Sequence, residues 1–260
     1  MESGNNTIKF LGTGGARFVV SRQLRHTGGM WCSFLGKNVL IDPGPGTLVR
    51  CLSSRPKLNP ESLDAIILTH RHLDHSSDAN IMIEAMTGGR VHKKGLLLAP
   101  YDAVSREEPV VFNYLQKSIE KVEILKEGLT FSIGDIEFST PVRHLHSVET
   151  YGLKFILQAK KVSFISDTAF FPELIEFYRS DILIINVVLY ELPRYSMIEH
   201  LDLENCRNII EQIKPHKAVL THFGLTMLRK NPRKLAEQLT LETGVQVISA
   251  YDGMTLHIDT

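Results

Sequence analysis

Three histidines and one aspartate lie within six residues of each other, in the string His70-Arg71-His72-Leu73-Asp74-His75. Neutral imidazole and carboxylate groups are protein ligands that suit zinc, manganese and iron. The spacing lets His70 and His72 bind one cation while Asp74 and His75 reach a second. A solvated surface loop rarely gathers four such groups. We therefore predict a site for two divalent cations here, with zinc or manganese as the first candidates and iron as a third.

Further candidate ligands lie just past apolar runs that read as strands: His146, Asp167 and His222. In open α/β sheets, the groups that bind ligands gather beyond the carboxyl ends of the strands. One histidine at such a position is more often structural, but three strand ends together with the histidine-rich string indicate a shared site. His144 stands two residues before His146 and is the main rival for its place.

The elements that must position these groups can be read from the apolar pattern. Leu63–Thr69 is a short run rich in isoleucine and leucine, typical of a buried strand, and it stops at His70. We therefore expect the histidine-rich string on a loop at the carboxyl end of that strand. The other expected strands are residues 8–11, 30–35, 38–41, 95–99, two or three within 123–140, 153–158, 162–166, 182–188, 218–221, 245–249 and 254–258. The expected helices are residues 47–53, 77–86, one within 107–122, 172–179, 202–213 and 232–240.

Strands dominate the first half of this pattern, and strand–helix alternation dominates the second. The order is typical of stacked sheets flanked by helices, in the α/β class. Neither an internal repeat nor a low-complexity linker divides the sequence. We expect a single domain over residues 1–260, since layered α/β architectures of this length fold around one hydrophobic interior.

Composition narrows the classes of function. The 29 basic and 29 acidic side chains balance, which disfavours a large nucleic-acid interface without excluding a local basic patch. The three cysteines are scattered and form no CxxC pair, as expected in a reducing cytoplasm. No secretion-signal layout opens the sequence. The longest apolar run, Ile182–Leu189, is too short for a bilayer and contains Asn186, so we expect no membrane span.

On these motifs the sequence resembles the metallo-β-lactamase superfamily over nearly the whole chain. The resemblance implies a four-layer αββα sandwich. It also implies how two cations share the ligands: His70, His72 and His146 for one, Asp74, His75 and His222 for the other, and Asp167 between them.

Two further motifs support this resemblance. The segment His146-Ser147-Val148-Glu149-Thr150-Tyr151-Gly152 has the histidine-to-glycine spacing of the family's phosphodiesterase branch, which favours His146 over His144 as the third ligand. Asp42-Pro43-Gly44 looks like the family's early aspartate motif. We expect Asp42 to orient a ligand histidine.

The C-terminal part resembles that phosphodiesterase branch, which includes RNase Z and the cyclic phosphodiesterase of bacterial phosphonate breakdown. The motifs shared with the latter occur in its order: Asp167-Thr168-Ala169, His200-Leu201-Asp202-Leu203, Thr221-His222 and Asp252-Gly253-Met254. The branch implies that His200 protonates the leaving group or stabilises the transition state. Asp202 either caps the following helix or orients that imidazole. We expect hydrolysis of a small or cyclic phosphodiester by a metal-activated water, with Asp74 and His200 as catalytic residues.

Two alternative activities stay open. A tRNA 3′-processing endonuclease would usually carry a long arm after the third histidine, whereas Gly152–Gln158 runs through residues 159–161 directly into the next strand. Glyoxalase-type thioester hydrolysis does not need His200. The cyclic phosphodiesterase carries a cysteine-based structural zinc site that this sequence lacks, so the resemblance implies the reaction class and not the metabolite. A non-catalytic member would typically have lost ligands.

The expected partner is a small phosphodiester. Relatives often form homodimers, which this sequence neither favours nor opposes. Arg17, Arg22 and Arg25 follow the N-terminal glycine turn and either hold a substrate phosphate or form a solvated basic loop.

Overall fold

A computed structural model describes residues 6–105, 107–193 and 197–259. Within these residues the strands form two mixed seven-stranded sheets. In spatial order, the first sheet contains β14 (Thr255–His257), β1 (Thr7–Phe10), β2 (Met30–Phe34), β3 (Lys37–Ile41), β4 (Ala65–Ile67), β5 (Leu96–Ala99) and β6 (Lys121–Ile124). The second contains β13 (Gln246–Ser249), β12 (Lys217–Thr221), β11 (Ile182–Asn186), β10 (Lys160–Ile165), β9 (Leu153–Leu157), β8 (Ile136–Thr140) and β7 (Leu129–Ile133).

Each sheet contains parallel strands, and candidate ligands lie just past the carboxyl ends of some of them. Strand β4 pairs parallel with β3 and β5, and β11 pairs parallel with β10 and β12. The sheets are also tied together by backbone hydrogen bonds, because the N–H of Phe223 donates to the carbonyl of Thr13 (2.8 Å) and the N–H of Gly15 donates to the carbonyl of Phe223 (3.1 Å). This link lies beside His222, so it fixes the N-terminal turn against the end of β12.

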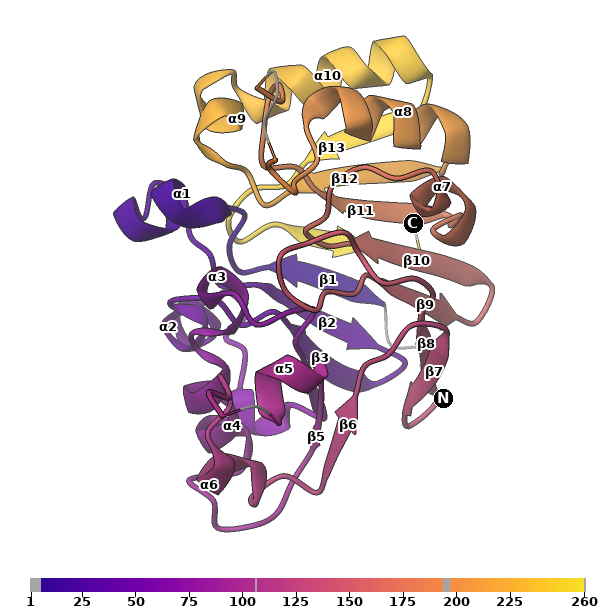
Figure 1. Cartoon of the computed structure of the whole chain (residues 1–260). Helices are drawn as coiled ribbons and strands as arrows, with labels where there is room; N and C mark the ends of the chain where they lie inside the picture. The colour runs from indigo at the N-terminus through magenta and orange to yellow at the C-terminus, as the bar shows by residue number, and fades with distance from the viewer. Residues whose placement is uncertain (1–5, 106, 194–196, 260) are drawn as a thin grey trace.

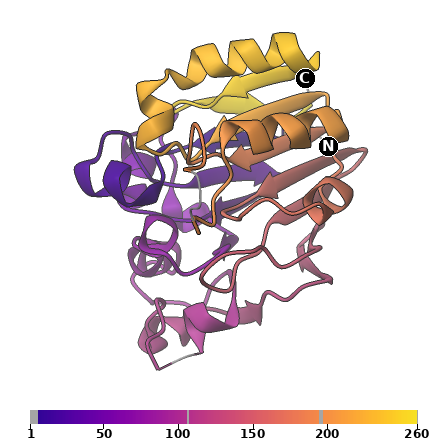
Figure 2. The ribbon, with the colours of Figure 1, turned by 45° about the horizontal axis from the view of Figure 1, so that its top comes forward.

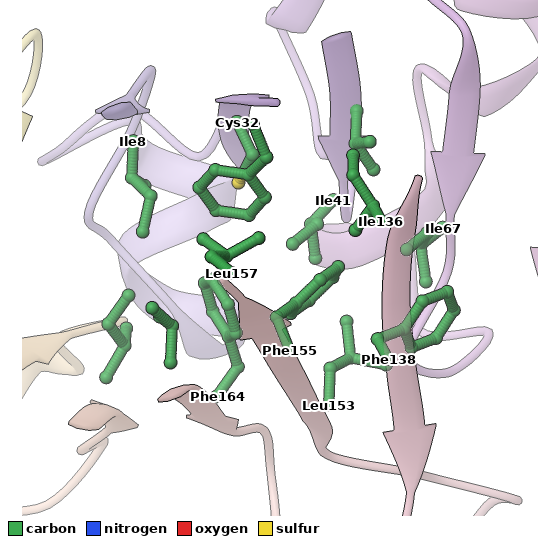
Figure 3. Packing of buried hydrophobic residues seen from close by; sticks show 14 of the residues in the cluster. Ile8, Cys32, Ile41, Ile67, Ile136, Phe138, Leu153, Phe155, Leu157 and Phe164 are labelled. Carbon is green, nitrogen blue, oxygen red and sulfur yellow. The ribbon is translucent and has the colours of Figure 1, made fainter. Parts of the chain in front are cut away.

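Apolar side chains fill the space between the two sheets. In Figure 3, Ile8, Cys32 and Ile41 of the first sheet lie opposite Phe155, Leu157 and Phe164 of the second, in one buried cluster. The side chains of β10 are buried on both faces of the second sheet. Val162 and Phe164 point to this inner cluster, whereas Ile165 belongs to the cluster under the outer helices.

Helices cover the outer face of each sheet (Figures 1 and 2). The first sheet is covered by helices between its strands: α2 (Thr47–Ser53), the 3₁₀ turn Pro60–Ser62, α4 (Ala79–Met86), α5 (Tyr101–Val104) and α6 (Asn113–Gln116). The second is covered by α7 (Glu173–Phe177), α8 (Leu203–Ile213), α9 (Leu225–Arg229) and α10 (Pro232–Thr243). The expected four-layer αββα sandwich is therefore confirmed. No described helix is long and apolar enough to cross a bilayer.

The sequence-based expectations differ from the structure in a few places. The histidine-rich string is not entirely a loop, because Leu73–Ser76 forms the one-turn helix α3. Helix α1 (Ala16–Arg22) was not expected; it carries Arg17 and Arg22, for which the sequence left open a phosphate-binding role or a solvated basic loop. The helix expected within residues 107–122 is present as α6. The expected domain also includes residues 1–5, 106, 194–196 and 260, which lie outside the described residues.

Candidate metal centre

The seven predicted ligands meet at one edge of the sandwich, although they come from positions as far apart as 70 and 222. They form three overlapping groups, in each of which one ligand atom per residue lies within 4.8 Å of the others: His70, His72 and His146; His70, His75 and Asp167; Asp74, His75 and His222. Two outer groups joined by a middle one that contains Asp167 match the expected arrangement of two neighbouring cations.

The contacts within these groups are close. His146 Nε2 lies 3.1 Å from His72 Nδ1 in one outer group. In the other, Nε2 of His222 lies 3.5 Å from an Asp74 carboxylate oxygen. The same nitrogen lies 3.5 Å from Asp167, whose carboxylate is also 3.5 Å from His75. The side chain of Asp167 is 2% exposed and Asp74 15%, so these charges need a partner other than bulk water.

The first outer group has the chemistry of a cation site. His70 is fully buried, and its Nε2 atom has no hydrogen-bond partner among the described residues. Burial lowers the pKa values of His70, His72 and His146, which keeps their imidazoles neutral and able to coordinate. A divalent cation satisfies the buried nitrogen, so these residues fit a metal.

The second outer group attracts positive charge. Burial alone lowers the pKa of His222, but the carboxylates of Asp167 and Asp74 together outweigh it and the pKa rises to about 9. Burial likewise opposes protonation of His75, yet Asp42, Asp167 and Asp74 together raise its pKa well above the ordinary value. A position at which carboxylates hold protons on two buried imidazoles also favours a divalent cation, which replaces those protons on binding.

Hydrogen bonds from outside the groups fix the ligand orientations. Nδ1–H of His75 donates to Asp42 (2.9 Å), which leaves Nε2 directed to the site. Asp42 in turn accepts from the backbone N–H and the hydroxyl of Thr69, both at 2.7 Å. This is the orienting role expected for Asp42. Nδ1–H of His146 donates to the carbonyl of Glu199 (3.0 Å), so its Nε2 is also free for coordination.

Replacing Asp42 by asparagine is expected to weaken metal binding by about 10- to 100-fold, because an amide cannot hold His75 in its present tautomer while accepting both bonds from Thr69. Chelator competition measures the affinity. Asp64→Asn is the matched control, since Asp64 accepts a backbone bond from Asn38 and pairs with Lys37 outside the site. Equal affinity of the Asp42 variant and the wild type would contradict the orienting role.

Sequence reasoning missed two residues that support the site. Nδ2 of Asn186 donates to Asp167 (2.8 Å), and the signal for it was present, since Asn186 is the polar residue within the apolar run 182–189. Gly15 lies directly against His222, and a Cβ atom at Gly15 would lie 2.1 Å from that imidazole. The next residue, Ala16, donates its N–H to Asp74 (3.0 Å). The glycine turn therefore forms a wall of the site.

His144 is excluded from the three groups by its own contacts. Its Nδ1–H faces the carbonyl of Asp167 (3.3 Å) and its Nε2 accepts from the hydroxyl of Tyr178 (2.9 Å). Both ring nitrogens are thus used, and burial lowers the pKa of His144 to about 3. Of the two rivals, His146 takes the place beside His70 and His72.

His200 lies at the rim of the same cluster. Its Nδ1 is 3.5 Å from Asp167, its ring centroid is 5.1 Å from that of His146, and its side chain is 20% exposed. Asp202 does not orient this imidazole. It caps α8 by accepting the N–H of Asn205 (2.9 Å), and its other oxygen accepts the N–H of Leu192 (2.9 Å).

A pocket of ≈ 430 Å³ opens onto the cluster. Its lining combines groups of the site with residues of α1 and α3: Ala16, Arg17, Val20, Ser21, His72, Leu73, Asp74, Asp167 and His200. A volume of this size holds a small organic ligand.

Comparison with known proteins agrees with this geometry. The sequence model of the protein family described as "Beta-lactamase superfamily domain" matches residues 37–223, which is more than half of the chain. An uncharacterized protein of Methanocaldococcus jannaschii is 32% identical over 259 residues, covering 96% of this chain and 94% of that protein. A ribonuclease Z of Borrelia garinii is 24% identical over an alignment of 314 residues, covering 96% of each chain. The crystal structure of a diphosphatase from the PhnP family has a TM-score of 0.69 at 22% identity, covering 97% of this chain and 96% of that one.

Proposed function

The chain belongs to the beta-lactamase superfamily, and from this membership and its joined histidine–aspartate groups we propose that it is a dinuclear metal-dependent phosphodiesterase. The observation that carries the proposal is the continuity of the three groups. His70 and His75 each belong to two of them, and the buried Asp167 lies in the middle one. Two cations held in this way would be neighbours, as the two-metal mechanism of phosphodiester cleavage requires.

We assign the ligands as the geometry groups them. One cation takes His70, His72 and His146, and the other takes Asp74, His75 and His222, with Asp167 between them. Zinc and manganese both suit these donors, and iron is a third candidate. Two divalent cations in this site supply a nucleophile at neutral pH and stabilise the phosphoryl oxygens of an in-line displacement.

The protein's own residues supply the rest of the chemistry. His200 borders the pocket and its Nδ1 faces Asp167, so the opposite edge of the ring is available to the leaving oxygen. Burial lowers the pKa of His200, and the carboxylate of Asp167 opposes this by stabilising the protonated ring, which is the form that donates a proton. Asp74 is the second residue to which we assign a catalytic role, beside His200. Its carboxylate accepts a hydrogen bond from the backbone N–H of Ala16.

A small diester is a better candidate than a precursor tRNA. Only two residues, Gln158 and Ala159, separate β9 from β10, which leaves no inserted arm there. The alignment with the ribonuclease Z spans 314 residues, more than the 260 of this chain, so that enzyme has segments for which this chain has no counterpart. The balanced net charge also disfavours a broad grip on RNA.

A substrate panel tests this proposal. The zinc- and manganese-loaded protein is incubated with bis-p-nitrophenyl phosphate, cyclic nucleotides, a precursor tRNA, a lactam and a glutathione thioester. We expect hydrolysis of the small phosphodiesters only. Selective cleavage of the thioester would contradict the proposal and favour a glyoxalase-type enzyme, and selective cleavage of the tRNA would favour the nuclease.

A further inference from the structure

The three arginines near the glycine turn have different surroundings. Arg25 serves the fold, because its guanidinium donates to Thr13 (2.8 Å) and to the carbonyl of Ala250 (3.1 Å) and lies over the ring of Phe223. Arg22 lies 5.9 Å from the ring centroid of the exposed Phe18. Arg17 makes no hydrogen bond or ion pair with any described residue, yet it lines the pocket in front of the cluster.

Arg17 is the permanently positive group among the described residues of that lining. It is exposed, whereas the side chains of Asp167 and Asp74, which share the pocket, are nearly buried. This difference in exposure indicates that the guanidinium lies nearer to solvent than the carboxylates do. We therefore expect an anionic group held by Arg17 to lie apart from the phosphoryl group that reacts at the cluster.

The wall beside Arg17 is apolar. Ala16, Val20 and Leu73 line it, and Leu73 is 72% exposed although it stands between two ligand residues. An uncovered leucine next to a polar site indicates a surface for the apolar part of a ligand. The pocket therefore suits an organic molecule with a charged end, and not a bare inorganic anion.

The backbone that carries Arg17 is fixed to the site. The neighbouring Ala16 donates its N–H to Asp74, and Gly15 donates its N–H to the carbonyl of Phe223. Helix α1 also packs against α3, which contains Asp74 and His75. The start of α1 is thus held in place relative to the ligands, which is the preorganisation that a specificity contact requires.

We infer that Arg17 is a specificity residue that binds a second anionic group of an organic phosphodiester, apart from the phosphoryl group that reacts. The inference rests on the proposed phosphodiesterase function and narrows its substrate class to diesters with an additional phosphate. Arg17 is suited to this role because a guanidinium binds a phosphate through two parallel hydrogen bonds.

Two chromogenic esters that differ only in the second phosphate test the inference. They are the p-nitrophenyl ester of thymidine 5′-phosphate and the same ester with a 3′-phosphate. Arg17→Ala is expected to lower kcat/KM for the doubly phosphorylated ester by about 10- to 100-fold, chiefly through KM, because a charge-assisted hydrogen bond is lost. The ester without the 3′-phosphate is expected to change less than about threefold. Arg22→Ala is the matched control and leaves both values unchanged.

A binding measurement separates this inference from the proposed function. Calorimetry of thymidine 3′,5′-bisphosphate and thymidine 5′-phosphate should show a preference for the bisphosphate that Arg17→Ala abolishes. If the wild type cleaves neither ester but keeps this preference, the phosphodiesterase proposal fails and the anion contact stands. An equal effect of Arg17→Ala on both esters, or no effect on either, would overturn the role of Arg17.

Discussion

Replacing His200 with alanine is expected to lower kcat by about 10²- to 10⁴-fold while the protein keeps its full metal content. His200 borders the pocket and faces Asp167 at 3.5 Å, but it belongs to none of the three ligand groups. Its loss therefore removes a proton donor and leaves the cations bound. Steady-state kinetics on a cyclic nucleotide, whose leaving alkoxide needs a proton, with elemental analysis of the same samples, measures both quantities.

The control for this substitution is His216→Ala. His216 is an exposed histidine that lies near Asp181, outside the cluster, so its removal should leave kcat unchanged. A substrate with a good leaving group should suffer less from His200→Ala than one with a poor leaving group, because the former needs less protonation. Unchanged turnover, or a loss that follows a loss of metal, would contradict the assignment of His200.

Replacing Gly15 with alanine is expected to weaken the binding of one cation by about 100-fold or more and to reduce activity accordingly. The added Cβ atom would lie 2.1 Å from Cδ2 and 2.3 Å from Nε2 of His222, which is far inside van der Waals contact. His222 is buried and must rotate or shift, so that Nε2 leaves its place beside Asp74 and Asp167. Titration with zinc in the presence of a competing chelator measures this loss.

Gly28→Ala is the control for Gly15→Ala. Gly28 lies close by in the sequence, but a Cβ atom there would meet Leu11 at 3.1 Å and no ligand residue. This variant should bind both cations as the wild type does. Binding of both cations by Gly15→Ala with wild-type affinity would show that the turn does not position His222.

The sequence indicated which side chains meet in the cluster because their residue types and their places after strands are local features. His70 lies three residues past Ile67, the last residue of the buried strand β4, so this strand places the string at its carboxyl end. The strands that precede Asp167 and His222 are equally clear, since their side chains are apolar on both faces. Parallel pairing of these strands with β11 then brings their carboxyl ends together.

The positions of His144 and His146 in the sequence do not decide which of the two joins the ligand groups. Both follow β8, and residue type alone does not separate them. Tyr178 separates them, because its hydroxyl occupies Nε2 of His144 from the residue after α7, 34 positions away. The resemblance to a known family gave the same answer through a motif, but the physical reason is a tertiary contact.

Helix α1 is the main element that the sequence pattern did not predict. It has seven residues, no side-chain cap and two neighbouring valines, all of which disfavour an isolated helix. Its start is fixed by tertiary hydrogen bonds, from Ala16 to Asp74 and from Gly15 to Phe223. No local pattern encodes those bonds. The separate places of Arg17, Arg22 and Arg25 depend on this helix and were therefore beyond sequence reasoning.

We propose that residues far apart in the chain together hold two divalent cations. Equilibrium dialysis of the purified protein against zinc or manganese, followed by elemental analysis, tests it most directly. We predict two cations per chain for the wild type, and at most one for a variant with Asp74 and His222 both replaced by alanine. A folded wild-type protein that binds no cation, or a double variant that still binds two, would contradict the account.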